Sequence, residues 1–514
     1  MNAKMYNQTA IKFWRSSLPA VLSALLLSAL LFPPSNLAQK KRPPLLPATR
    51  DYFDGKILLI PRDGRLQQLR MLAQIADQDL LLPPSRLLEP APQAEPLMEW
   101  AEKLNLSSIN GLIVSLETIT AGTAPEKLPQ QLSPLRQARK KHPQLPIYGF
   151  ATLDSANASQ QLCRAALDLV ADGTLNYLLI AQAEGLNAKP AQIARARLIG
   201  EAASRRLEDR VAFDDSTAAA AATLLARLIA GRYSQTPKIL SVYSSKEGSQ
   251  VKESRNPIEL ERSVAAKIKI AGGAAPTTAE AAAGADIALF VHTPQTNPET
   301  RLVFAKAASQ AIEKGVRVAL VDLSENKTGK DAVLAELRGQ KQLDRLLSYA
   351  SSNLSDEAET REAVNRALAQ AVLHFTAMKS LRTDADRVLR IDRAQVTLLF
   401  SRYLQDWGYN LIVLPKLDEY VQKQLKAAPD NLGQNIEAAE KFAFEQLQPI
   451  ADELFEEQFR RNSHVILLNN GARAQFRISL LQRLLVRLDS GKTTEAEIKQ
   501  SIHTFYEGRL LPTK

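Results

Sequence analysis

Short apolar runs alternate with helical stretches from residue 56 to about residue 350, and this alternation limits the possible folds more than any other feature. Runs such as "KILLI" are separated by amphipathic or alanine-rich stretches. Continuous apolar runs of this length are typical of parallel strands buried on both faces, with crossover helices between them. The ten candidate strands are residues 56–60, 79–82, 111–116, 147–153, 176–181, 210–213, 238–243, 286–291, 317–322 and 346–350.

The alternation predicts an α/β protein with a parallel strand frame over residues 56–355. Ten strands can close into an eight-stranded (β/α) barrel with extra strands, or they can form two doubly wound sheets in tandem. Because helix and strand alternate without a clear linker between two halves, the sequence slightly favours the barrel. The expected helices are residues 66–77, 130–141, 158–171, 190–207, 216–231, 258–271, 299–314 and 330–338.

After about Asp356 the pattern becomes mainly helical, so we expect a helical C-terminal region over residues 356–514. Asp406 to Tyr409 are interpreted as a helix C-terminus with Gly408 as its cap, and a ligand-stacking element is the alternative. One short strand is expected at 464–468 and a last short helix within 495–514. The expected long helices are residues 356–380, 384–408, 416–426, 434–461 and 473–488.

The N-terminus has the features of an export signal. Basic residues precede an apolar run at 18–32, which matches the charged and apolar regions of a secretory signal. A buried core helix is the less favoured reading, because the run is terminal and its flank is basic. We expect residues 1–38 to be a signal peptide or, if uncut, a tilted membrane anchor. Residues 39–55 read as a Pro-rich linker, and the protein is expected in the periplasm or outside the cell.

The composition argues against several classes of site. The net charge is +10, but both signs are mixed along the chain and no aromatic-plus-basic motif is present, so we expect no nucleic-acid binding. Cys163 is the single cysteine and reads as a small core residue. The five histidines are scattered, and no Walker, GxSxG or HExxH pattern occurs. We therefore expect no metal and no cofactor, and the sequence does not predict an oligomeric state.

Polar residues follow nearly every candidate strand, and the carboxyl ends of parallel strands share one edge. Paired carboxylates there could act as acid and base, or as acid and nucleophile, in glycosyl hydrolysis. Such side chains also cap the next helix or face solvent, which is the structural alternative at any single position. The candidate catalytic residues are Asp63, Glu117, Glu184, Asp214, Asp215 and Asp322. The candidate ligand-binding residues are Arg62, Arg65, Asp154, His292, Asn326 and Asn353.

The segment "ILLIPRDGR" at 57–65 carries a family resemblance. An apolar strand leads into Pro61, Asp63 and Arg65, where members of a bacterial family have Pro-x-Asp-Asp-Arg-Pro. The chain resembles that family, domain of unknown function 4127, from about Lys56 to Tyr409. Five further segments fit it, in whole or in part: "LLLPPSRLL" (80–88), "NPIELERSV" (256–264), "VALVDLSEN" (318–326), "YASSN" (349–353) and "LQDWGY" (404–409).

Several acidic positions of the family pattern are missing, and Gly64 replaces its second aspartate. A missing carboxylate can neither hold a proton nor assist a leaving group. The resemblance therefore leaves two hypotheses open. One is an exported envelope protein that binds, and with weakened activity hydrolyses, a glycan or other polyol. The other is a non-catalytic binding, scaffold or interaction module outside the cytoplasm.

Overall fold

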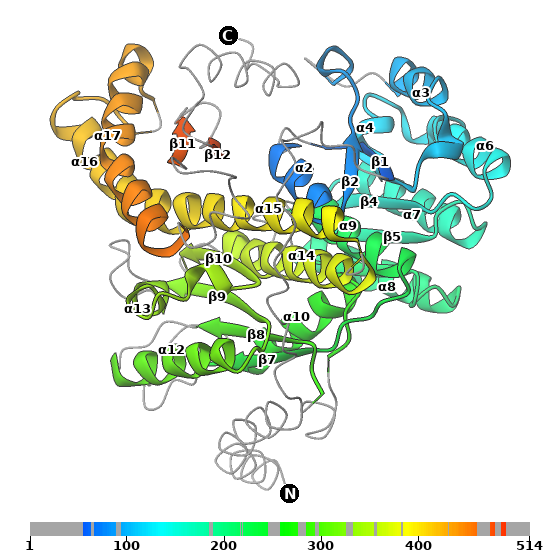
Figure 1. Cartoon of the computed structure of the whole chain (residues 1–514). Helices are drawn as coiled ribbons and strands as arrows, with labels where there is room; N and C mark the ends of the chain where they lie inside the picture. Colours follow the sequence, from blue (N-terminus) through cyan, green and yellow to red (C-terminus); the bar gives the residue numbers. More distant parts are fainter. Residues whose placement is uncertain are drawn as a thin grey trace, which may run out of the picture.

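Two open parallel sheets, with helices on their faces, form the α/β part of the chain (Figure 1). The computed structural model describes residues 55–62, 66–88, 94–183, 189–215, 217, 219–244, 257–275, 284–292, 298–324, 333–353, 357–381, 384–429, 431–459, 473–477 and 485–489.

The first sheet has six parallel strands in the order β2-β1-β3-β4-β5-β6. From β1 the chain moves to β2 at one edge and then crosses to β3 on the other side of β1. The strand order therefore reverses between β1 and β3, and such a switch point opens a crevice at the carboxyl ends of both strands. The strands are β1 (Gly55–Ile60), β2 (Gln78–Leu81), β3 (Gly111–Ser115), β4 (Ile147–Leu153), β5 (Tyr177–Gln182) and β6 (Val211–Asp214).

The second sheet has four parallel strands in sequential order. They are β7 (Ile239–Tyr243), β8 (Ile287–His292), β9 (Val318–Ser324) and β10 (Ser348–Asn353). All ten predicted strands are present, and the α/β class is confirmed. Of the two arrangements left open, the described strands adopt two separate open sheets, so the slightly favoured barrel is not the one they form. The barrel would need β6 to pair with β7, and no such pairing joins these two strands.

Four helices, α2, α9, α10 and α14, form an inner layer between the sheets (Figure 1). Inward-facing residues of both sheets, such as Leu59 and Val321, share one hydrophobic core with this layer. Helix α9 has the sequence AAATLLARLIAGR and is buried on most of its surface, as expected of a helix packed on several sides. The inner helices are α2 (Leu66–Ile75), α9 (Ala220–Arg232), α10 (Pro257–Ile270) and α14 (Glu357–Leu381).

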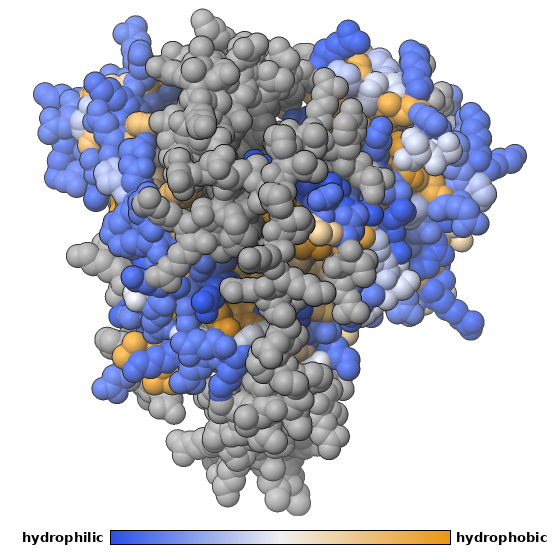
Figure 2. Space-filling model, in the orientation of Figure 1, coloured by the Kyte–Doolittle hydropathy of each residue, from blue (hydrophilic) through white to orange (hydrophobic). Residues whose placement is uncertain are grey.

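The remaining α/β helices cover the outer faces of the two sheets. Helices α3 to α8 form a second core with the first sheet, and α12 and α13 contribute to a third core with the second sheet. Hydrophilic residues cover much of the surface seen over these helices (Figure 2). Their bounds are α3 (Ala94–Glu102), α4 (Leu116–Ile119), α5 (Leu128–Gln131), α6 (Ser133–Lys141), α7 (Asn157–Ala171), α8 (Lys189–Ser204), α12 (Pro298–Glu313) and α13 (Val333–Gly339). Cys163 of α7 is fully buried, as predicted.

The described C-terminal region is mainly helical, as predicted. Helix α15 continues into a π-helix, η5, which contacts β10 of the second sheet, and the next two helices pack on η5. These elements are α15 (Ala385–Arg402), η5 (Tyr403–Val413), α16 (Leu414–Lys423), α17 (Ile436–Leu454) and η7 (Phe455–Phe459). The expected strand at 464–468 and the expected helix within 495–514 lie outside the described residues, as does the 1–38 segment. Within the described residues, no helix has the length and apolar character needed to span a bilayer.

Two local predictions in this region are wrong. Residues 473–488 contain an antiparallel pair, β11 (Arg473–Arg477) and β12 (Leu485–Asp489), instead of a helix. In the register of this pair, the backbone of Phe476 lies opposite that of Val486. Gly408 is also no helix cap, because it lies inside η5. A Cβ atom at this position would come 3.2 Å from Leu447 Cδ1, so the glycine lets η5 pack closely on α17.

Candidate functional site

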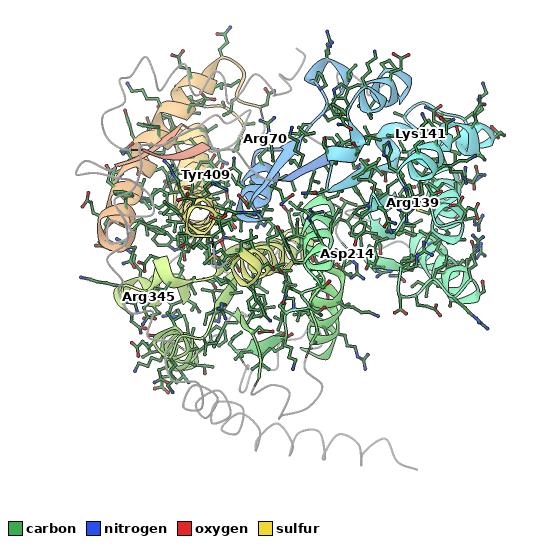
Figure 3. All side chains as sticks on the ribbon, turned by 45° about the vertical axis from the view of Figure 1, so that its right-hand side comes forward. Arg70, Arg139, Lys141, Asp214, Arg345 and Tyr409 are labelled. Atoms are coloured by element: carbon green, nitrogen blue, oxygen red, sulfur yellow. The ribbon has the colours of Figure 1, made fainter. Side chains whose placement is uncertain are left out.

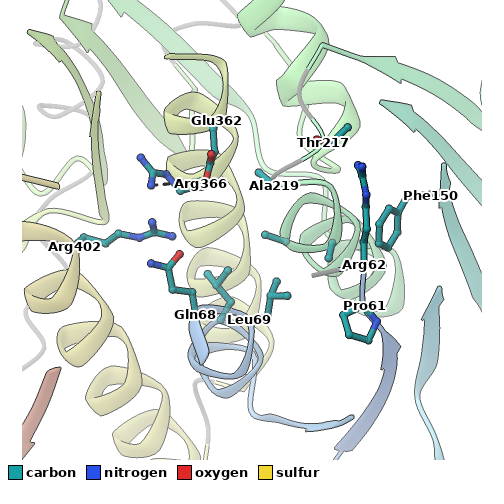
Figure 4. Close-up of a pocket in the computed structure, with 13 residues that line it drawn as sticks. Pro61, Arg62, Gln68, Leu69, Phe150, Thr217, Ala219, Glu362, Arg366 and Arg402 are labelled. Carbon is teal, nitrogen blue, oxygen red and sulfur yellow. Dashed lines mark ion pairs between the residues drawn. The ribbon is translucent and has the colours of Figure 1, made fainter. Parts of the chain in front are cut away.

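A small cavity of about 40 Å³ lies at the end of β1, the strand next to the switch point (Figure 4). It has room for a few water molecules or one small polar group. Its walls come from both halves of the chain, because β1, β4, α2 and α9 meet α14 and α15 there. The lining residues are Pro61, Arg62, Gln68, Leu69, Leu72, Phe150, Thr217, Ala219, Ala221, Ala222, Glu362, Arg366 and Arg402.

Pro61 and Arg62 bring the end of β1 to this cavity. Pro61 lacks an N–H group, so the strand ladder stops there, and its carbonyl accepts a 2.8 Å hydrogen bond from Thr118 Oγ1. Arg62 is exposed, and its Nη1 donates to Thr152 Oγ1 at the end of β4 over 2.6 Å. The predicted ligand-binding residue Arg62 therefore reaches across the carboxyl ends of three neighbouring strands.

Helix α14 contributes Glu362 and Arg366, one turn apart (Figure 4). Arg366 Nη2 donates to the Ser351 carbonyl at 3.1 Å and lies 3.4 Å from Asp406 Oδ2. Its Nη1 lies 3.8 Å from Glu362 Oε1, which is beyond hydrogen-bond distance. Within the described residues, the buried Nε–H of Arg366 has no acceptor. Arg366 is thus anchored at one nitrogen and can still donate hydrogen bonds from its others.

Arg402, the last residue of α15, completes a set of three arginines with Arg62 and Arg366. Arg402 is only 1% exposed, and it enters the cavity from the side opposite Arg62 (Figure 4). A guanidinium presents paired N–H donors that match the oxygens of a carboxylate or phosphate. Gln68 and Thr217 add an amide and a hydroxyl to the walls. Chemically, the cavity suits an anionic group.

The sequence reasoning missed Arg366 and Arg402, because it searched only the ends of strands. A signal was present in the helices. Arg402 lies four residues after Leu398 and three after Leu399, both of which are buried. Residues at these spacings share one face of a helix, so Arg402 is a charged residue on the apolar face of α15. Buried arginines are rare unless they are paired or bind a ligand.

Glu117 and Asp154, two predicted site residues near this edge, make structural hydrogen bonds. Glu117 Oε1 accepts from the Thr152 backbone N–H, and its Oε2 accepts from Ser115 Oγ at 3.1 Å. Asp154 Oδ1 accepts from the Ala156 backbone N–H at 2.7 Å and from Ser159 Oγ at 2.5 Å, which fixes the start of α7. Both carboxylates therefore fulfil the structural role that capping and strand-end residues often have.

Asp214 and Asp215, at the end of β6, form a buried ionic cluster with Lys267 of α10. Lys267 Nζ lies 2.5 Å from Asp214 Oδ1 and 2.6 Å from Asp215 Oδ1. Asn365 of α14 donates to Asp214 Oδ2 at 2.7 Å, and Arg361 Nε lies 3.3 Å from Asp215 Oδ2. Figure 3 shows Asp214 in the interior of the molecule, beside the inner helices. The cluster therefore joins the first sheet to α10 and α14.

Burial and charge act in opposite directions on this cluster. Burial raises the pKa of Asp214 more than the charge of Lys267 lowers it. Burial alone would also raise the pKa of Asp215, but Lys267, hydrogen bonds and Arg361 together hold it below its usual range. For Lys267, burial would lower the pKa, yet the two carboxylates together raise it. A protonated Lys267 with such partners is a structural cation and a poor nucleophile.

His292 and Asp322 lie in the second sheet, where their backbones are directly paired across β8 and β9. Ser244 Oγ lies 3.2 Å from His292 Nδ1. Burial lowers the pKa of His292 to about 4, with a further contribution from the charge of Arg301. Burial raises the pKa of Asp322 to about 7, against the opposing effect of the backbone N–H groups of Leu334 and Val333. Burial thus favours the neutral form of both residues.

The predicted single rim is therefore divided. Arg62 and Glu117 both contact Thr152, and Asp214 and Asp215 both contact Lys267. His292 and Asp322 lie apart from them, in the second sheet. Asp63, Arg65, Glu184 and Asn326 lie outside the described residues, and only the backbone of Asn353 is described. The described part of the chain contains no group of three or more His, Cys, Asp or Glu residues that could hold a metal ion.

One protein family matches most of the chain. The model described as "Protein of unknown function (DUF4127)" covers residues 57–161 and 154–480. No curated protein matches.

Solved structures match only weakly. Haloferax volcanii malate synthase, in its magnesium/glyoxylate complex, is 13% identical over 81% of this chain and 94% of its own, with a TM-score of 0.19. The carboxyl transferase domain of Rhizobium etli pyruvate carboxylase with 3-bromopyruvate is 9% identical over 85% and 88%, also with a TM-score of 0.19. Likenesses at these scores support no inference about fold or ligand.

Proposed function

The chain belongs to the DUF4127 family of proteins of unknown function, and we propose that this member is an exported binding protein for a small ligand that carries an anionic group. The observation that carries the proposal is the cavity at the switch point, where Arg62, Arg366 and Arg402 line one small space. They come from the end of β1, from α14 and from α15, so folding brings them together.

The contacts of three predicted catalytic carboxylates, Glu117, Asp214 and Asp215, favour binding over hydrolysis. A general acid or base must be within hydrogen-bond reach of the reacting group. Glu117 uses both oxygens within the first sheet, and the two carboxylates at the end of β6 are held by Lys267. Of the two hypotheses from the sequence, these contacts support the non-catalytic binding module.

Acidic sugars combine the properties expected of the ligand. The cavity holds about 40 Å³, which is enough for a carboxylate, sulfate or phosphate group but not for a sugar ring. The anionic group would enter the arginine-lined cavity, and a hydroxylated remainder would lie outside it. This ligand class keeps the glycan or polyol expected from the polar strand ends and adds the charge that the arginines require.

Calorimetry with D-glucuronate, acetate, sulfate and neutral D-glucose tests the proposal. We expect an anion to bind and glucose to bind at least tenfold more weakly. Arg62→Gln should weaken anion binding by tenfold or more, because a hydrogen bond to a charged group contributes about 1.5–3 kcal/mol. The matched control is Arg232→Gln, which removes the same charge from the exposed far end of α9 and should leave the affinity unchanged.

Three results would contradict the proposal. A bound ligand at a concentration of 100 times its Kd should stabilise the fold by about 2.7 kcal/mol. The first contradicting result is therefore that no anion in the panel binds or raises the melting temperature. The second is equal binding of glucose and glucuronate. The third is an equal loss of affinity in Arg62→Gln and Arg232→Gln, which would indicate general screening of the protein's positive charge.

The export part of the proposal rests on the sequence of residues 1–38. Cell fractionation of the full chain should find the protein outside the cytoplasm, and a chain that starts at residue 39 should stay inside. N-terminal sequencing of the exported protein distinguishes a cleaved signal from a retained anchor. Equal distribution of both chains among the fractions would refute export by this segment.

A further inference from the structure

The π-helix η5 carries an acidic residue, Asp406, directly behind the proposed ligand site. Its side chain is fully buried, and its Oδ2 accepts from the Ser351 backbone N–H at 3.3 Å. The Asp406 carbonyl also accepts from Ser351 Oγ at 3.0 Å. π-Helical turns are rare and occur frequently at functional sites. Here the wide turn joins two segments, "YASSN" and "LQDWGY", that are far apart in the sequence.

Arg366 connects Asp406 to the cavity. Its Nη2 is held by the Ser351 carbonyl and lies 3.4 Å from Asp406 Oδ2, whereas its Nη1 faces Glu362 at 3.8 Å. Two carboxylates therefore already share the charge of this arginine. Any anion that binds to the remaining donors of Arg366 must share it with them as well.

We propose that Asp406 is a specificity-determining residue of the arginine-lined cavity, which weakens the binding of doubly charged anionic groups more than that of singly charged ones. The proposal rests on the function proposed above and adds the residue that lowers the relative affinity of its site for dianions. The reason is that electrostatic repulsion grows in proportion to ligand charge. Asp406 therefore repels a doubly charged group twice as strongly as a singly charged one, whatever the total charge of the cavity.

Asp406 could act in a second way, by holding Arg366 in position. The hydrogen bonds around Asp406 distinguish this positioning role from the electrostatic one. In Asp406→Asn the amide oxygen can still accept from the Ser351 N–H, the backbone carbonyl still accepts from Ser351 Oγ, and the Ser351 carbonyl still holds Arg366 Nη2. The substitution thus preserves the hydrogen-bonded position of Arg366 and removes one negative charge. The electrostatic effect should dominate.

The size of the effect follows from Coulomb's law. An anion on the free edge of the guanidinium would lie roughly 7 Å from Asp406, given ordinary hydrogen-bond lengths. With the dielectric screening of a partly hydrated site, removal of one carboxylate at that distance should strengthen binding of a monoanion about fivefold. The repulsion energy between Asp406 and a dianion is twice that for a monoanion. Removal of the carboxylate should therefore strengthen dianion binding by the square of the fivefold change, about 25-fold.

Sulfate and methanesulfonate form a suitable pair of probes, because both are tetrahedral and they differ by one charge. Calorimetry at pH 7.5 on the full-length protein gives the affinity of the wild type for each probe and hence their ratio. Asp406→Asn should shift the ratio of the two affinities about fivefold toward sulfate. Glu362→Gln, on the cavity wall, should shift it in the same direction and gives the answer if Asp406→Asn does not fold. Asp172→Asn, at an exposed surface ion pair with Arg136, is the control and should leave the ratio unchanged.

The outcomes separate this inference from the proposed function. An unchanged sulfate-to-methanesulfonate ratio in Asp406→Asn, or in Glu362→Gln if Asp406→Asn does not fold, overturns the specificity role of Asp406 while anions still bind. It leaves the binding function standing. Weaker binding of both probes in Asp406→Asn overturns it in favour of a positioning role. Failure of both probes and of the sugar acid to bind wild type overturns the proposed function, and the inference with it.

Discussion

Asp322 shows how strongly burial can change the protonation of one residue. It lies within β9 and is fully buried, and the backbone N–H groups of Leu334 and Val333 do not offset the effect of this burial. An ionised carboxylate in such a place is unfavourable, so the folded state holds the proton more tightly than the unfolded chain does. The pKa is accordingly raised to about 7, compared with about 3.9 in an unfolded chain.

The raised pKa predicts how Asp322 affects stability at different pH values. Between about pH 4 and pH 7 the folded state binds this proton and the unfolded state does not, so stability falls as pH rises. The stabilising contribution is complete below about pH 4 and is lost above pH 7, with a size on the order of 4 kcal/mol. Asp322→Asn should therefore be more stable than wild type at pH 8, and this advantage should shrink by pH 5. Urea unfolding at both pH values measures the difference.

The quantity to compare is the difference in the free energy of unfolding between wild type and Asp322→Asn, because Asp215 changes the stability of both proteins with pH in the opposite direction. Its pKa is lowered in the folded state, so its contribution to stability disappears as the pH falls. Subtraction removes that background. A constant difference between wild type and Asp322→Asn from pH 5 to pH 8 would show that Asp322 has an ordinary pKa.

At the scale of elements, an ionic contact fastens α15 to the first sheet. Asp77, in the turn between α2 and β2, is fully buried with a backbone φ of 55°. Its Oδ2 accepts from Arg387 Nε at 2.5 Å, and its Oδ1 accepts from Arg390 Nη2 at 3.3 Å. Aspartate and asparagine tolerate this left-handed conformation better than most residues.

Asp77→Ala should destabilise the protein by about 3 kcal/mol, because it leaves two partly buried arginines without their partner. Asp77→Asn should destabilise the protein less, because asparagine tolerates the left-handed backbone conformation and its amide oxygen can still accept a hydrogen bond from one arginine. Asp172→Ala, which breaks the surface pair with Arg136, should cost less than about 1 kcal/mol. Denaturant midpoints of the three variants provide the comparison, and similar costs for Asp77→Ala and Asp172→Ala would rule out a structural role for this contact.

The elements also show which parts of the fold the sequence could predict. Continuous apolar runs such as 287–292 are long enough and buried enough to be recognised locally, and all ten strands were predicted. Residues 473–488 carry apolar side chains at spacings that fit both a helix and a strand pair, so local pattern could not decide. The structure resolves the ambiguity, because the backbone of 473–477 pairs with that of 485–489.

The candidate site was predictable only where it follows a strand. Arg62 is marked by its position after β1, whereas Arg366 and Arg402 enter the cavity from helices of the C-terminal region. The sequence could not decide between a barrel and two sheets for the same reason, because that choice also depends on contacts between distant segments. It depends on whether β6 pairs with β7, and the inner helices α9 and α10, next to these strands in the chain, lie between the two sheets.

At the scale of the whole molecule, one inner layer joins the two sheets. Residues of both sheets contribute to the same core, and the cluster of Asp214, Asp215 and Lys267 bridges β6 and α10. Neither sheet has a complete hydrophobic core without this layer. The α/β part and α14 should therefore unfold together, as one cooperative unit.

Tryptophan fluorescence tests this cooperativity, because Trp100 lies in α3 and Trp407 lies in η5. Two single-tryptophan proteins, each with the other tryptophans replaced by Phe, should unfold at the same urea concentration. Lys267→Met, which removes the buried cation that Asp214 and Asp215 share, should lower both midpoints equally and cost about 3–5 kcal/mol. Two separated transitions, or a shift of one midpoint only, would show that the sheets unfold independently.

The shared inner layer also determines when the chain can finish folding during its synthesis. Helices α2 and α9 leave the ribosome well before their packing partners α15 and α14, and Asp77 and Arg387, which bind each other, are 310 positions apart. At roughly 5–20 residues per second, the apolar surfaces of the early helices wait on the order of ten seconds or more for their partners. A chain stopped before residue 357 therefore presents a large apolar surface, which makes it a substrate for chaperones and prone to aggregate.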